Sequence, residues 1–361
     1  MLGDIDAMFD DDDDAEIVEF LEYERRPYIV REREDFFHSL DDIDFFVRFR
    51  LKKITVLYIL SLIEEELESV TDRNHSISPI NQLLLTLRFY ATGNFLLTVG
   101  DFIKVSKSSA SKIVKKVSEA IATFSGRFIK MPSNDEEIRK AKSSFYEKAH
   151  VPRVIGSLDC THIKIQSPGG NNAELFRNRK GYFSINVQTI SAPNLKILDI
   201  TARWPGSQHD QIIFDNSSIK SRLERNEFGN SLLVADSGYA NSMHVITPLL
   251  EARTQVQQLY NEAVTRTRNP VERQYGLWKR RFPVLSTGLR LKLQTTLTVI
   301  VATAVLHNIA IDQNEEQPPD IPNLDENIIN YEEDISVDPP ENNFMNAREL
   351  LLSEYFPGLL N

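Results

Sequence analysis

The sequence contains a single cysteine, Cys160, so an intrachain disulfide is excluded. No group of cysteines and histidines stands at the spacing of zinc ligands, and the Walker A and dinucleotide-binding glycine motifs are also missing. Cys160 has no evident partner base, which favours a structural side chain over a nucleophile. A disulfide-stabilised secreted domain, a zinc module and a nucleotide-binding enzyme of these types are therefore excluded, and a reducing compartment is expected.

Long apolar runs are missing as well. The most apolar stretch, Leu297–Leu306, is shorter than the roughly 20 residues that a membrane-spanning helix needs, so we predict a buried helix there. Residues Met1–Asp6 lack the basic start and apolar run of a signal peptide. We therefore expect an intracellular protein without a membrane association.

Positive charge is scarce overall, because 52 acidic residues outnumber 41 basic ones and the formal net charge is −11. The excess acid lies at the two ends: residues 1–50 hold 17 acidic and 6 basic side chains, and residues 312–361 hold 13 and 1. The span between them holds 22 acidic and 34 basic side chains. Such a basic body can bind a phosphate backbone and release its counterions, although a solvated face on an ordinary enzyme has the same composition.

Composition and periodicity predict four regions. The first is an acidic N-terminal segment, partly disordered because the five aspartates of Asp10–Asp14 repel one another. A helical domain and an α/β domain follow, and an acidic tail ends the chain. Within the tail, Ala347–Phe356 predicts a short helix that docks on the body or on a partner. In chain order, the four regions span residues 1–50, 51–148, 150–311 and 312–361.

Helical periodicity fills Leu51–Glu68 and Ile80–Ala91 in the second region. A short helix over Thr98–Val105 is then followed by a second helix, which Ser106 or Ser108 can cap. The pair resembles a helix-turn-helix, whose second helix could enter a major groove of DNA. The alternative is a plain helical bundle with a solvated lysine face. The lysines that would contact DNA are Lys107, Lys112, Lys115 and Lys116.

From about residue 150 the pattern becomes that of an α/β fold with mixed strand pairing. The predicted strands are Val154–Ile165, Tyr182–Ser191, Leu195–Arg203 and Leu232–Ala235. The predicted helices are Ile212–Glu224, Pro270–Arg281 and Gln294–Ile311. The second of these helices is expected to begin at Asn269-Pro270, because proline suits the first position of a helix.

Three acidic residues stand out by their positions in this pattern. Asp159 lies within the first strand, Asp236 directly follows the short fourth strand, and Glu272 lies in the first turn predicted for the helix after it. A carboxylate in an apolar strand costs free energy unless it is paired or binds a metal. If the two strands are parallel neighbours, Asp159 and Asp236 converge at the edge of the sheet where ligands bind, and Glu272 can reach over them.

Three carboxylates without a cysteine or histidine quartet suit a hard cation such as Mg²⁺ or Mn²⁺. Two such ions, roughly 3.5–4 Å apart, can activate a water or a 3′-hydroxyl and stabilise the leaving oxygen of a phosphodiester. The ions also offset the mutual repulsion that would otherwise raise the pKa values of the carboxylates. Spacing alone is weak evidence for this chemistry, because the chain has 52 acidic residues.

The sequences around the three acids are more specific. Gly156–Ile163, Trp204–Asp210, Ala235–Tyr239 and Asn269–Pro283 resemble, in this order, signature blocks of the PIF/Harbinger superfamily of DDE transposases. The resemblance covers residues 90–310. It implies an RNase H-like catalytic domain and a metal-dependent DNA nuclease. It also implies that the metal ligands, two divalent ions of Mg²⁺ or Mn²⁺ being expected, are Asp159, Asp236 and Glu272.

Other residues of these blocks have less certain roles. His162 could orient Asp159, contact phosphate, or be an ordinary core histidine. His209 and Asp210 are accessory candidates from a family block, and Asp210 could simply cap a helix. The basic residues after Glu272, and those before the second strand, could hold phosphate or be solvated surface. The phosphate candidates are Arg177, Arg179, Lys180, Lys279 and Arg281.

Three functions are compatible with these features. The first is an endonuclease derived from a Harbinger-type transposase, and the complete acid triad favours it. The second is a catalytically silent DNA-binding or adaptor protein, and the third is the transposase of a live element. The resemblance implies a Myb/SANT-like DNA-binding partner. A DNA substrate implies a nuclear location, and import through the partner implies a cytoplasmic pool as well. Whether the chain forms a homo-oligomer stays open.

Overall fold

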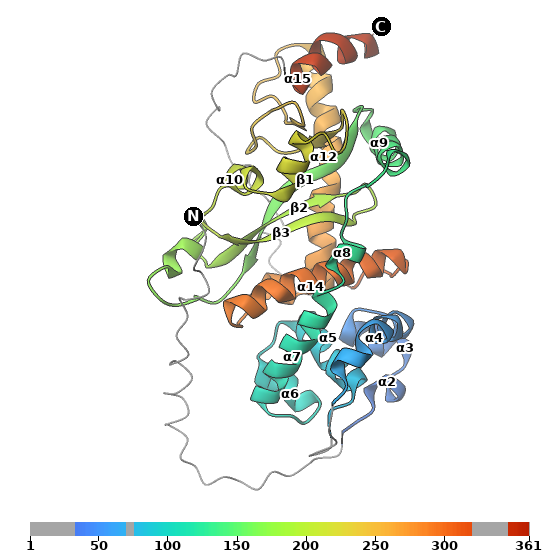
Figure 1. Ribbon diagram of the computed structural model, residues 1–361, viewed down its shortest axis with the longest axis vertical. Helices are drawn as coiled ribbons and strands as arrows, with labels where there is room; N and C mark the ends of the chain where they lie inside the picture. The colour runs from blue at the N-terminus through green and yellow to red at the C-terminus, as the bar shows by residue number, and fades with distance from the viewer. Residues whose placement is uncertain (1–32, 70–75, 320–345, 361) are drawn as a thin grey trace.

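The computed structural model describes residues 33–69, 76–319 and 346–360. A bundle of helices lies at one end and a twisted sheet at the other, and the long helix α14 (Leu293–Asp312) runs between them (Figure 1). The aspartate run Asp10–Asp14 and most of the predicted acidic tail lie outside the described residues.

The bundle contains the helices predicted from periodicity, and two further helices precede them. Its elements are α2 (Phe36–Ser39), α3 (Asp42–Phe49), α4 (Lys53–Leu67), α5 (Pro79–Thr92), α6 (Leu96–Phe102) and α7 (Lys107–Ala122). The helix-turn-helix-like pair is α6 and α7, and Ser106 rather than Ser108 caps α7 by accepting a hydrogen bond from the Ser109 amide at 3.1 Å. Phe45 and Phe49 of α3 are fully buried, so the packed bundle begins before residue 51.

Two helices, α8 (Ser125–Phe128) and α9 (Asp135–Ala149), lead from the bundle to a five-stranded sheet of order β3-β2-β1-β4-β5. β1 pairs antiparallel with β2, as β2 does with β3, whereas β1–β4 and β4–β5 are parallel. This mixed sheet confirms the predicted α/β, RNase H-like class. The strands are β1 (Val154–Lys164), β2 (Ser184–Ser191), β3 (Ile197–Pro205), β4 (Leu232–Val234) and β5 (Val245–Ile246).

Helices cover both faces of the sheet. On one face lie α12 (Gln255–Arg281) and α14, and on the other lie α10 (Asp210–Asp215) and α11 (Ser218–Glu224). One continuous hydrophobic core joins the bundle to the first face, and it includes Trp278 of α12 and Val187 of β2, both fully buried. α12 therefore packs on the sheet, and its C-terminal end reaches the bundle, where Arg281 donates to the Arg50 carbonyl at 2.8 Å.

Two helix predictions were wrong in their bounds. The single helix predicted over Ile212–Glu224 is two helices, because the Ser217 side chain accepts a hydrogen bond from the Lys220 amide and caps a new helix there. The helix predicted to begin at Pro270 begins fifteen residues earlier, at Gln255, where Thr254 and Gln257 form a capping box.

Pro270 lies inside α12 because packing outweighs its local cost. Proline removes one backbone hydrogen bond and crowds the preceding turn, at a cost of roughly 3 kcal/mol. Tyr260 and Val264 before it, and Val271 and Tyr275 after it, are all fully buried or nearly so. Burying each such side chain contributes roughly 1.5–3 kcal/mol, so the helix continues through the proline. Glu272 consequently lies in the middle of a long helix.

The C-terminal segment docks on the body of the protein. α15 (Ala347–Leu350) and the turns Leu351–Tyr355 and Phe356–Leu359 lie at the far end of α12 (Figure 1). The Phe356 ring packs edge-on against Tyr260 of α12 at 5.4 Å between ring centroids, and the Tyr355 hydroxyl donates to the carbonyl of His150 at 2.9 Å. The sequence predicted that this segment docks either on the body or on a partner, and in the described residues it docks on the body.

Within the described ranges, α14 is the one helix whose length and composition would suffice to cross a membrane. It has 20 residues, and 67% of its most apolar window is buried inside the fold, against α7 and β3. The prediction of a buried helix over Leu297–Leu306 is therefore confirmed. The remaining short helices are the 3-10 turn Ala173–Phe176 and α13 (Val284–Thr287).

Candidate active site

The pairing of β1 with β4 brings two of the predicted carboxylates together. The strands are parallel, as predicted, and Ser157 of β1 lies opposite Val234 of β4. Two residues farther along, β1 carries Asp159 and the chain that leaves β4 carries Asp236. Because β4 ends at Val234, no strand within the described ranges pairs with this part of the β1 edge. The register thus places both aspartates at one edge of the sheet.

Asp159 is buried, with 3% of its surface exposed. Its Oδ1 accepts a hydrogen bond from the Cys160 amide at 2.7 Å, and its Oδ2 faces Nη1 of Arg268 at 3.3 Å. Burial and then the negative charge of Asp236 raise the pKa of Asp159 well above its usual value, and Arg268 opposes them only in part. The site therefore holds more negative charge than Arg268 alone offsets.

Asp236 is half-buried in the turn after β4. Its Oδ1 accepts a hydrogen bond from the Gly238 amide at 3.0 Å, which closes a turn characteristic of aspartate. A side chain at position 238 would bring its Cβ to 3.1 Å from that same oxygen, so the turn leaves little space there. The sequence Asp236-Ser-Gly-Tyr therefore fixes the direction of the carboxylate as well as turning the chain.

One face of α12 completes the site, because Arg268, Glu272, Tyr275 and Lys279 recur at helical spacing and point toward β1. The Tyr275 hydroxyl donates to the Asp159 carbonyl at 2.7 Å, and Lys279 Nζ donates to Thr161 Oγ1 at 2.7 Å. Glu272 Oε1 accepts from Arg268 Nη2 at 2.5 Å. Arg268 thus bridges the strand aspartate and the helix glutamate, and Glu272 lies at the rim with 35% of its side chain exposed.

Asp210 belongs to the same group of acids. The alternative role as a helix cap is wrong, because His209 occupies the N-cap position of α10 and makes no capping hydrogen bond with its side chain. Instead Asn186 Nδ2 donates to Asp210 Oδ1 at 2.8 Å and to the Gln208 carbonyl at 3.0 Å. The charge of Asp210 also raises the pKa of Asp159, although it ranks behind burial and Asp236 as a cause. The Trp204–Asp210 block therefore delivers a fourth carboxylate to this edge.

The two accessory histidines lie on the basic side of the site. His162 contacts Ser184 Oγ through Nδ1 at 3.1 Å, and burial, followed by the charges of Lys279, Lys180 and Arg179, lowers its pKa to about 4. His162 is therefore neutral at neutral pH. Exposed His209 accepts a hydrogen bond at Nδ1 from Arg179 Nη2 at 2.6 Å.

The predicted phosphate contacts divide into exposed and buried side chains. Arg281 is only 2% exposed, and its guanidinium donates to the carbonyls of Arg50 and Glu316 at 2.8 and 2.9 Å. It joins α12 to the bundle, so its assignment as a phosphate contact was wrong. Lys279 is also buried, within the site. The exposed candidates are Lys107, Lys112, Lys115, Lys116, Arg177, Arg179 and Lys180, of which Arg177 pairs with Glu174.

Lys279 gives a prediction for stability. Burial lowers its pKa from 10.5 to about 8, despite the opposing effect of Asp159. The folded protein therefore loses this proton near pH 8, whereas the unfolded chain keeps it until about pH 10.5, and stability from this group rises with pH between the two values. We expect wild type to gain on the order of 1–3 kcal/mol relative to Lys279→Met across this window. Urea unfolding of both proteins at about pH 7 and about pH 10 checks this, and an unchanged difference would contradict it.

The carboxylate oxygens of the site suit a hard divalent cation, but Glu272 is turned toward Arg268 and not toward the two aspartates. Among the residues that the structure describes, no group of three or more His, Cys, Asp or Glu side chains is arranged to hold a metal ion. Asp159 and Asp236 nevertheless lie together, offer only oxygen donors, and repel each other. Glu272 is turned toward Arg268 instead. The two aspartates therefore suit a divalent cation, whereas Glu272 has its Oε1 engaged by Arg268.

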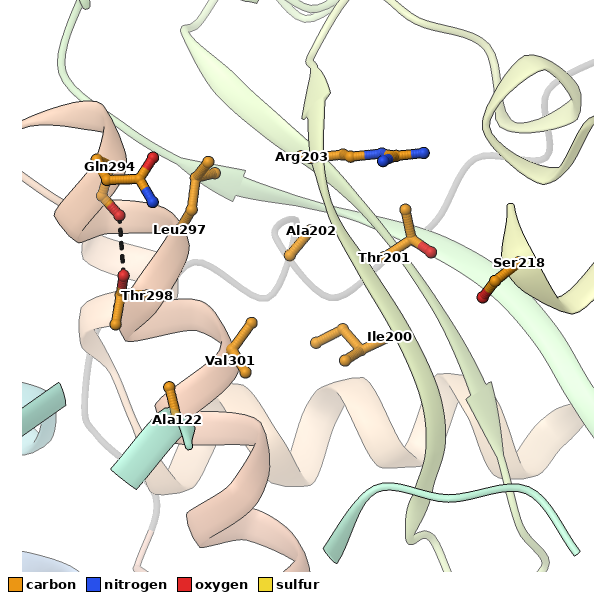
Figure 2. Close-up of a pocket in the computed structure, with 10 residues that line it drawn as sticks. All are labelled: Ala122, Ile200, Thr201, Ala202, Arg203, Ser218, Gln294, Leu297, Thr298 and Val301. Atoms are coloured by element: carbon orange, nitrogen blue, oxygen red, sulfur yellow. Dashed lines mark hydrogen bonds between the residues drawn. The ribbon is translucent and has the colours of Figure 1, made fainter. Parts of the chain in front are cut away.

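A pocket elsewhere on the domain contains none of these residues. It has a volume of about 400 Å³ and lies between the edge strand β3 and helix α14. Figure 2 shows Ile200 and Ala202 of β3 facing Leu297 and Val301 of α14 across it, with Arg203 at one end. It is therefore separate from the carboxylate site.

Sequence reasoning missed Arg268 and Tyr275, which both contact Asp159. Their helical spacing from Glu272, four residues before and three after, would have indicated a shared face. That signal was hidden because the helix was predicted to begin at Pro270, which left Arg268 outside it.

Comparisons with known proteins agree with this geometry. Residues 158–308 match the family described as the DDE superfamily endonuclease. HARBI1, which carries the name of a nuclease, is 31% identical over 279 residues in both Bos taurus and Homo sapiens, covering 73% of this chain and 80% of the relative. An ALP1-like protein of Arabidopsis thaliana is 24% identical over 314 residues, covering 81% of this chain and 77% of that protein. No solved structure matches significantly. The chain therefore belongs to the family of Harbinger transposase-derived nucleases, with a DDE superfamily endonuclease domain.

Proposed function

We propose that this protein is a divalent-metal-dependent DNA endonuclease, derived from a Harbinger-type transposase and acting without full transposition. The observation that carries the proposal is the β1–β4 register, which places Asp159 and Asp236 side by side at an open strand edge. The nuclease names of the relatives and the endonuclease family of the domain support the same class of reaction.

Asp159 and Asp236 would hold the metal, Mg²⁺ or Mn²⁺ and two ions in the full site, and Glu272 would complete the ligand set. Bound there, the metal would supply a nucleophile for the phosphodiester and stabilise the leaving oxygen. The chain itself orients the donors. Tyr275 hydrogen-bonds the Asp159 backbone, Gly238 holds the Asp236 carboxylate, and Asn186 holds Asp210 beside them. These contacts fix the carboxylates before substrate arrives, which is the arrangement that lowers an activation barrier.

DNA is the proposed substrate, with two basic surfaces as its contacts. Lys107, Lys112, Lys115 and Lys116 are exposed along α7, the second helix of the helix-turn-helix-like pair. Arg179 and Lys180 are exposed near the carboxylate site. Binding through such contacts weakens steeply with salt. A Myb/SANT-like protein is the proposed partner, on the family resemblance. The proposed nuclear location follows from the DNA substrate, and the proposed cytoplasmic pool follows from import through that partner.

Cleavage of a labelled DNA duplex tests the proposal. We expect wild type to cut with Mg²⁺ or Mn²⁺ and to stop when a chelator is added, whereas Asp236→Ala, matched for folding by circular dichroism, does not cut. Asp44→Ala is the matched control, because Asp44 is an exposed carboxylate on α3, outside the proposed DNA contacts, and should leave cutting unchanged. Absence of cutting by wild type, with DNA binding demonstrated and a Myb-like partner supplied, would overturn the proposal.

That negative outcome would favour a catalytically silent DNA-binding or adaptor protein. One observation supports this second candidate: Glu272 is paired with Arg268 and is not assembled with the two aspartates. In that case the acids would be the remains of a former site. Salt-dependent DNA binding that persists in Asp236→Ala would then be the remaining activity.

A further inference from the structure

We propose that Arg268 is an internal cation that takes the place of the metal in the metal-free protein, so that metal binding must exchange it away from Asp159 and Glu272. The inference rests on the proposed function, because it concerns how the same site is loaded. It adds a role for a residue that the sequence motifs did not single out.

Arg268 is placed to act in this way by its position on α12. Its Nη1 lies 3.3 Å from Asp159 Oδ2, and its Nη2 lies 2.5 Å from Glu272 Oε1. The side chain is only 10% exposed, and that of Asp159 only 5%. One guanidinium therefore joins a ligand from the strand to a ligand from the helix, in surroundings that water screens poorly.

The charges of the site show why an internal cation is needed. Asp159 lies close to Asp236 and Asp210, so at least two carboxylates repel it. A buried charge without a counterion is strongly destabilising, and removing one partner of a buried ion pair exposes that cost. Arg268 offsets part of it in the metal-free state. A divalent ion would offset more of it, and would then compete for the same oxygens.

The competition affects metal affinity. A divalent ion that binds the Glu272 carboxylate repels the guanidinium held at Oε1, so metal binding displaces Arg268 and breaks the Arg268–Glu272 pair. The apparent affinity for metal is lowered by the free energy of that pair, as for any ligand that selects a less populated state. Removing Arg268 should therefore destabilise the metal-free protein and tighten metal binding, two effects with opposite signs.

Metal titrations of the full chain test this without relying on cleavage. Mn²⁺ binding is measured by calorimetry, and the melting temperature is recorded with and without Mn²⁺, for wild type, Arg268→Ala and Arg268→Lys. Arg266→Ala is the control, because Arg266 is an exposed arginine two residues away, paired with Glu262 on the same helix. We expect Arg268→Ala to melt lower without metal, to bind Mn²⁺ about tenfold more tightly, and to gain more from metal than wild type does.

Arg268→Lys keeps the positive charge but lacks the planar fork that reaches two carboxylates, so its affinity should fall between those of wild type and Arg268→Ala. It also keeps the test decisive if the alanine variant does not fold. Equal or weaker Mn²⁺ binding by both variants, with wild-type binding abolished by Asp236→Ala, would overturn this inference alone. No Mn²⁺ binding by any variant would overturn it together with the proposed metal-dependent function.

Discussion

Replacing Asp159 with asparagine is expected to abolish DNA cleavage while leaving the metal-free protein at least as stable as wild type. Asparagine keeps the shape of the side chain and an oxygen for the Cys160 amide, but it removes the charge that would hold a cation. Loss of one member of a catalytic group commonly lowers the rate on the order of 10³-fold or more. We expect a loss of that size in duplex cleavage with Mg²⁺ or Mn²⁺.

The stability of this variant follows from the raised pKa of Asp159. Folding raises the pKa of the Asp159 carboxyl above its value of 3.8 in the unfolded chain. Below pH 3.8 the carboxyl is protonated in both states, so it costs no stability there. Above that pH the unfolded chain ionises more readily, so wild-type stability falls as the pH rises toward the folded pKa. Asparagine has no such cost. Arg268 keeps Glu272 as a partner in the variant, so no buried charge is left alone.

Urea unfolding in the presence of a chelator measures this difference. The stability of Asp159→Asn relative to wild type should increase between about pH 4 and about pH 8. A variant less stable than wild type at the higher pH would show that the Arg268 pair outweighs the repulsion from Asp236. Such an outcome would assign Asp159 a structural role. Stability gained as activity is lost would instead mark a site whose geometry is kept for function.

The strand part of the site could be predicted from sequence, because it depends on local patterns. Asp159 lies in an apolar run, and Asp236 follows another, so burial on both faces fixes each strand. Parallel pairing then brings the two acids to one edge, as the register shows. The order of the four sequence blocks indicated the PIF/Harbinger family, and that family in turn predicted the RNase H-like fold.

The helix part of the site could not be predicted in the same way, because packing outweighs local preference there. Pro270 is a strong local signal for a helix start, yet α12 passes through it on the burial of residues far apart in sequence. Arg268 was consequently left outside the predicted helix. The role of Asp210 was left open between an accessory residue and a helix cap for a similar reason: its neighbour in space, Asn186, lies on a strand 24 residues away. Periodicity within one segment carries no information on such contacts.

Gly206→Ala is the second substitution for which we expect a large effect. It tests whether the Trp204–Asp210 block positions Asp210. An added Cβ at Gly206 would lie 2.2 Å from Ser184 Oγ, 2.7 Å from the Phe176 carbonyl oxygen and 2.8 Å from the Ser184 carbonyl oxygen. The hydroxyl can rotate away, but the two carbonyls belong to backbone that the strand and its neighbouring turn hold in place. The segment that begins at Gly206 must therefore shift, and overpacking of this kind costs about 1–3 kcal/mol.

The shift should affect the site more than it affects the fold. Gln208 and Asp210 lie two and four residues after Gly206, and Asn186 hydrogen-bonds both of them. Displacing Asp210 moves one of the negative charges that act on Asp159. Misplacement by about 1 Å can lower a rate by about 10²-fold, and we expect a loss of that order in DNA cleavage.

A second glycine provides the matched control for Gly206→Ala. A Cβ added at Gly276 has no atom within 4 Å, and this residue lies within α12 among the site residues. Gly276→Ala should stabilise the helix by roughly 0.5–1 kcal/mol and leave cleavage unchanged. Thermal unfolding and duplex cleavage of both variants separate the two effects. If Gly206→Ala cut DNA as well as Gly276→Ala does, the close approach at Gly206 would have no part in positioning Asp210, and the block would serve packing alone.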